Sequence, residues 1–218
     1  MTSINKNATT FTIVLLAGII GASWIISIRL MNGMDMGVAT RLGSFIPFIV
    51  MWTVMMAAMM LPGISPAIVR IARTNSYIRK VLIFIVTYLV VWALFGVIVY
   101  FLYRPHDFTA AGITVIAAGI YELTPLKKNF RGCCYIKIDS GFKFGLHCVG
   151  CTIGLMLIQV ELGIMSLIWM LVITVIITAQ KLLPAKAAID TPLALAIIGF
   201  GILIILAPST VHSLMTPM

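Results

Sequence analysis

The segment SFIPFIVMWTVMMAAMMLPG, Ser44 to Gly63, contains no charged residue, and it decides the fold class. A hydrophobic stretch of about 20 residues is long enough for an α-helix to cross a bilayer. A backbone in hydrocarbon must satisfy its own hydrogen bonds, and a helix does so. We therefore predict a transmembrane helix at this position.

The whole chain has a similar composition. Its 218 residues are 61% hydrophobic and 10% charged, and the mean hydropathy is +1.14. Soluble domains carry about 25% charged residues. This composition predicts an all-α, polytopic helix bundle that forms a single transmembrane domain over residues 1–218. We expect it to be a multi-pass protein of the cell membrane, surrounded by the lipid bilayer.

Further apolar runs of suitable length divide the chain into about seven spans. A tight turn at Glu161–Gly163 separates the fifth span from the sixth, and we expect Gln159 and Glu161 to be solvated there. The predicted spans are Thr10–Met31, Ser44–Gly63, Val81–Tyr103, Phe108–Leu123, Phe142–Val160, Gly163–Leu183 and Pro192–Ala207.

The basic residues indicate how the spans are oriented. With seven spans, Arg29, Arg41 and Arg104 lie on one side, and all the others of the 15 Lys and Arg residues lie on the opposite side. Cytoplasmic loops are enriched in Lys and Arg, so this asymmetry predicts a cytoplasmic N-terminus. It also explains the net charge of +9 without a nucleic-acid partner.

The second span is rich in methionine. On a helix, Met51, Met55 and Met59 form one ridge, and Met56 and Met60 form a second ridge beside it. Thioether sulfur is a soft, neutral ligand that suits Cu(I), and it costs little to bury. The alternative is that these flexible side chains only fill an apolar core.

All four cysteines lie between residues 133 and 151, at the predicted cytoplasmic side. A reducing cytoplasm disfavours structural disulfides, so metal binding or redox exchange is the better explanation for the CxxC at Cys148 and Cys151. Adjacent cysteines do not readily bind one ion together, so we expect either Cys134 or Cys133 to join this pair. Three thiolates suit Cu(I), whereas a fourth ligand from His147 would suit zinc. Buried, unreactive thiols are the remaining alternative.

Five motifs together resemble a family of predicted metal-binding integral membrane proteins. The family is a domain of unknown function that is sometimes labelled a copper chaperone. They are MWTVMMAAMMLPGISP, YELTPLKKNF, GLHCVGCTIGLM, GIMSLIWM and AQKLLP, and they cover most of residues 51–184. The resemblance implies a family-like metal-binding core over residues 51–184, with Cys134, Cys148 and Cys151 as the best-matched thiols. Phe130, Thr152 and Gln180 depart from the family pattern, and Cys133 is an additional cysteine.

No triad, P-loop or dinucleotide-binding motif is present, so we do not expect an enzyme. The leading hypothesis is delivery or transfer of copper(I), with zinc as the alternative metal. In this hypothesis Met34 and Met36 collect the ion outside, Met55, Met56, Met59 and Met60 carry it inward, and the cysteines hold it. One alternative is an accessory or assembly subunit of a larger membrane copper-enzyme complex, an oxidase or monooxygenase. Another is a thiol-redox membrane protein.

Overall fold

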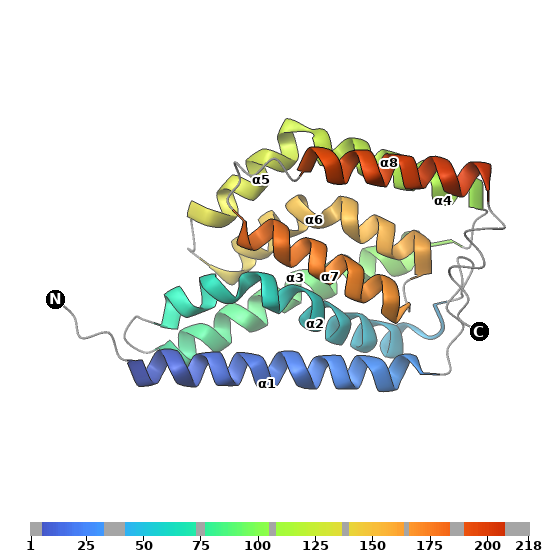
Figure 1. The fold of residues 1–218 in the computed structure, drawn as a ribbon. Helices are drawn as coiled ribbons and strands as arrows, with labels where there is room; N and C mark the ends of the chain where they lie inside the picture. Colours follow the sequence, from blue (N-terminus) through green and yellow to red (C-terminus); the bar gives the residue numbers. More distant parts are fainter. Residues whose placement is uncertain are drawn as a thin grey trace.

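The computed structural model describes residues 6–32, 42–72, 77–104, 108–136, 140–163, 166–183 and 190–207, and all regular secondary structure within these ranges is α-helical. The helices run along a common direction in a layered bundle (Figure 1). They are α1 (Lys6–Met31), α2 (Phe45–Ala72), α3 (Tyr77–Leu102), α4 (Phe108–Leu123), α5 (Pro125–Ile136), α6 (Gly141–Gly163), α7 (Leu167–Leu182) and α8 (Asp190–Leu206).

Seven of these helices lie where apolar spans were predicted. Four are long and apolar enough to cross a membrane, namely α1, α2, α3 and α6, and α4, α7 and α8 are shorter apolar helices. Large apolar side chains are exposed on the outside of the bundle, including Val14, Phe101 and Leu206. Soluble monomers rarely expose so much contiguous apolar surface, so the arrangement fits a lipid environment.

Helix α6 is central to the bundle, because it contacts α3, α4, α5 and α7. Helix α2 contacts α1, α3 and α7, and α4 pairs with α8 at the opposite edge from α1 (Figure 1). Glycines allow the close approach of α4 and α8: a Cβ atom on Gly201 would lie 2.6 Å from Ile116 Cγ1 and 3.0 Å from the Gly112 carbonyl oxygen. Small residues at such contacts are typical of membrane helix pairs.

Helix α2 is longer than predicted, because it continues through Pro62 and Pro66 to Ala72. Each proline removes one helical hydrogen bond. The Ser65 hydroxyl donates to the Pro62 carbonyl oxygen at 2.8 Å and so adds a local bond at this point.

Two further expectations are wrong. Helix α6 ends at Gly163, whose φ of 125° is strained for any residue with a side chain, so a break is present near the predicted turn. However, Gln159 and Glu161 are buried rather than solvated, and Gln159 Nε2 donates to the Gly163 carbonyl oxygen at 3.1 Å. The segment after the fourth span, predicted as a loop, contains α5.

Candidate metal centre

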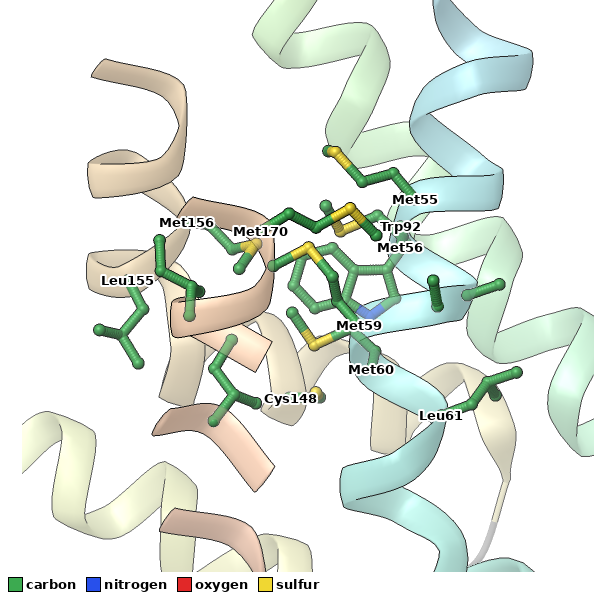
Figure 2. Packing of buried hydrophobic residues seen from close by; sticks show 14 of the residues in the cluster. Met55, Met56, Met59, Met60, Leu61, Trp92, Cys148, Leu155, Met156 and Met170 are labelled. Atoms are coloured by element: carbon green, nitrogen blue, oxygen red, sulfur yellow. The ribbon is translucent and has the colours of Figure 1, made fainter. Parts of the chain in front are cut away.

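The methionines of α2 lie inside the bundle and not on its lipid-facing surface. Met55, Met56, Met59 and Met60 all have 0% exposure. Two more fully buried methionines, Met156 on α6 and Met170 on α7, belong to the same apolar cluster. Figure 2 shows these side chains directed toward the space between α2, α6 and α7. We call these six thioethers the sulfur row.

The Cys148 thiol lies at one end of the sulfur row, beside Met60 (Figure 2). Lys181, in the last turn of α7, connects the two sulfur atoms. Its Nζ donates to Cys148 Sγ at 2.8 Å and lies 3.8 Å from Met60 Sδ. The Tyr88 hydroxyl of α3 lies 3.1 Å from Cys148 Sγ. Side chains from α2, α3, α6 and α7 therefore meet at this thiol.

Cys151 lies one turn further along α6 and is also buried. Its thiol donates to the Cys148 carbonyl oxygen at 3.3 Å, and both cysteines are free thiols. Thr152 donates to the same carbonyl oxygen at 2.8 Å. A spacing of three residues places Cys148 and Cys151 on neighbouring parts of one helix face. The CxxC is therefore a helical pair of thiols inside the bundle.

His147 belongs to a different face of α6. Its Nδ1 lies 2.7 Å from the Lys143 carbonyl oxygen, and its ring packs edge-on against Phe130. Among the described residues, no three His, Cys, Asp or Glu side chains gather in a group that could hold a metal ion. Cys133 and Cys134 are in the last turns of α5, where the side chains are outside the described residues, as are Met34 and Met36.

A second polar system lies where α4, α5, α7 and α8 meet. Glu122 is fully buried and forms an ion pair with Lys127, which is 1% exposed. Gln180 Nε2 donates to Glu122 Oε2 at 3.1 Å and to Asp190 Oδ1 at 3.2 Å. We call these four residues the carboxylate cluster. None of its side chains supplies sulfur, so it differs chemically from the sulfur row.

A family model described as copper chaperone (PpoB2) matches residues 49–204. The chain belongs to this copper chaperone family. The match includes every residue of the sulfur row, both buried cysteines and the whole carboxylate cluster. No curated protein and no solved structure is significantly similar to the chain.

Membership of the copper chaperone family suggests a copper-related role, and the donor types fit it. Thioethers and thiols are soft ligands that select Cu(I), whereas structural zinc sites use four Cys or His ligands in a tetrahedral arrangement. The six thioethers are neutral, so an apolar interior accommodates them at little cost when no metal ion is bound.

Sequence reasoning missed four residues of this site: Met156, Met170, Tyr88 and Lys181. Met156 and Met170 are single methionines in ordinary apolar runs, and only the packing of α6 and α7 against α2 brings them to the row. Lys181 was counted only as a topology signal on the cytoplasmic side. Its place in the AQKLLP motif, inside a predicted span, was the signal that could have identified it.

Proposed function

We propose that this copper chaperone binds Cu(I) within the bilayer at the sulfur row and exchanges it with the Cys148 thiol. The observation that carries the proposal is that six methionines from three helices are fully buried in one cluster that ends at a cysteine. Weak, replaceable thioether contacts suit an ion that must leave each position, and a thiolate suits tighter retention at one end.

The membrane topology belongs to the same proposal. We place seven spans in the membrane, α1 to α4 and α6 to α8, with the N-terminus in the cytoplasm. In this arrangement α2 ends, α6 begins and α7 ends on the cytoplasmic side. Cys148 and Lys181 then lie toward the cytoplasm, and Met55 lies deeper in the bilayer. The ion would therefore meet thioethers first when it enters from outside.

The binding part of the proposal is tested by Cu(I) binding to the reduced chain in lipid nanodiscs without oxygen. The variant Met55→Leu/Met56→Leu/Met59→Leu/Met60→Leu keeps side-chain volume and hydrophobicity, so it should fold, while its copper content falls. Met31→Leu is the control, because Met31 is also fully buried but belongs to α1. Competition with a chromophoric Cu(I) chelator measures the affinity. Equal copper content in all three proteins would show that the row only fills the core.

Delivery and binding are separated by a second measurement. Cells that depend on the chaperone are grown under copper limitation and under copper excess. The quadruple variant should impair growth in at least one condition, while Met31→Leu should not. A reporter fused after each predicted loop tests the seven-span arrangement independently of copper.

A further inference from the structure

Trp92 of α3 is a fully buried aromatic residue in the same apolar cluster as the thioethers of α2. Two contacts fix its height in the bundle. The Trp52 Nε1 atom of α2 donates to the Trp92 carbonyl oxygen at 3.0 Å, so the Trp92 backbone lies at the level of Trp52. One turn earlier on α3, the Tyr88 hydroxyl lies 3.1 Å from Cys148 Sγ, at the end of the sulfur row beside Met60. The centre of the row therefore lies between these two levels.

The Trp92 indole extends from the first of these levels toward the second. A helical side chain points toward the N-terminus of its own helix, which for Trp92 is the direction of Tyr88. The Nε1 edge of the indole accordingly lies near the Tyr88 hydroxyl, and the two ring centroids are 6.5 Å apart. The α2 thioethers that follow Trp52 occupy the same interval. Figure 2 shows the indole ring among these thioethers.

The two buried indoles of α2 and α3 have different surroundings. The Trp52 ring stacks on Phe48 at an interplanar angle of 29°. The aromatic neighbours of Trp92 on its own helix are Phe95 and Tyr88, which lie at 83° and 68° to the indole plane, so neither stacks on it. An aromatic ring thus covers the indole of Trp52, whereas the indole of Trp92 adjoins the sulfur row.

A Cu(I) ion in the sulfur row needs a partner for its charge. Thioether sulfur is neutral, so the ion keeps its positive charge while only methionines hold it. A charge without a partner is costly to bury in an apolar interior. The face of an indole ring carries negative electrostatic potential, and it is the best aromatic partner for a cation within about 6 Å of the ring centroid. A neutral partner of this kind stabilises the ion and still allows it to leave.

We propose that Trp92 is a further Cu(I)-binding residue, whose indole face contacts the ion while the α2 thioethers hold it. This inference rests on the proposed function and adds to the sulfur row a binding group that has no sulfur atom. Because the Nε1 edge lies near Tyr88, the ring lies between the thioethers and the Cys148 thiol. The indole therefore stabilises the ion at the step from thioether to thiol.

Fluorinated tryptophan tests the proposal in the intact chain, because fluorine withdraws electron density from the indole face and changes its size little. The chain has four tryptophans, so the same labelling is repeated in Trp92→Phe. Competition with a chromophoric chelator measures the Cu(I) affinity of the reduced proteins in nanodiscs without oxygen. The affinity should fall stepwise as fluorine atoms are added to the unmodified chain and should stay constant in Trp92→Phe. An equal effect in both chains, or no effect in the unmodified chain, would overturn the proposal.

Substitution gives the size of the contribution. Trp92→Leu removes the ring and should weaken Cu(I) binding by about 5- to 30-fold, the range for a cation–π contact shielded from water. Trp92→Phe should weaken it less, because a phenyl ring is a poorer partner than an indole. Trp52→Phe is the matched control, since Trp52 is equally buried but stacks on Phe48, and it should change the affinity less than either variant.

The outcome can be distinguished from that of the proposed function. Cu(I) binding that requires the α2 methionines but ignores fluorination would support the sulfur row and overturn the role of Trp92 alone. Absence of Cu(I) binding to the unmodified chain would overturn both. If Trp92→Leu does not fold, the fluorinated chains still decide the question.

Discussion

Gly63 of α2 provides the space through which Lys181 reaches the sulfur row, so Gly63→Ala tests the geometry of the site. A Cβ atom on Gly63 would lie 2.7 Å from Lys181 Cδ and 3.5 Å from its Cβ. The contact is with the middle of the lysine stem and not with its flexible end. Relief of the clash therefore displaces Nζ from Cys148 Sγ, to which it now donates at 2.8 Å.

Two opposing terms set the expected size of the effect. Alanine is more favourable than glycine inside a helix by about 1 kcal/mol. Loss of a hydrogen bond that involves a charged group costs about 1.5–3 kcal/mol. The net expectation for Gly63→Ala is a decrease of roughly 0.5–2 kcal/mol in the free energy of unfolding, which is the difference between these terms.

When Lys181 is first changed to alanine, Gly63→Ala should raise the free energy of unfolding instead of lowering it. No stem then crosses Gly63, and only the helix-propensity gain of about 1 kcal/mol remains. The coupling between the two positions should thus be about 1.5–3 kcal/mol in a double-mutant cycle. Reversible unfolding by SDS in mixed micelles, followed by circular dichroism, measures all four proteins.

Gly199→Ala on α8 is the control, because an added Cβ there has no neighbour within 4 Å. It should stabilise the chain equally with and without Lys181. An equal loss of stability from Gly63→Ala in both Lys181 backgrounds would refute the reasoning, since the lysine stem would not be the cause.

Three other changes have clear expectations. Cys148→Ser should weaken Cu(I) binding more than Cys151→Ser, because Cys148 is the thiol beside Met60, and equal losses in chelator competition would contradict this. Gly201→Ala should lower the free energy of unfolding by about 1–3 kcal/mol through overpacking of α4 against α8, whereas Gly199→Ala should not, as SDS unfolding will show. Tyr88→Phe should cost about 1 kcal/mol in the same assay by removing the hydroxyl near Cys148 Sγ, and an unchanged midpoint would argue against that contact.

The positions of the apolar helices were predictable from the sequence, because lipid exposure requires long uncharged runs whatever the tertiary packing. The predicted fourth span, Phe108–Leu123, coincides with α4. The burial of Met55, Met56, Met59 and Met60 was also predictable, because both explanations for their spacing place them inside the bundle. Burial alone fits both a metal path and a core, so the choice between them stays a prediction.

The polar contacts between helices were not predictable in the same way. A lysine near the end of a span carries the same topology signal whether it is solvated or buried, so Lys127 and Lys181 were both counted only as topology signals. The ion pair of Glu122 with Lys127 is buried, because α7 and α8 contribute Gln180 and Asp190 around it. Contacts that depend on four helices leave little trace in any one segment.

Helix α7 connects the sulfur row and the carboxylate cluster through adjacent residues. Gln180 donates to Glu122 and Asp190, whereas Lys181 donates to Cys148, and neighbouring side chains on a helix differ in direction by about 100°. A Cu(I) ion on Cys148 Sγ would compete with the Lys181 ammonium for the same sulfur.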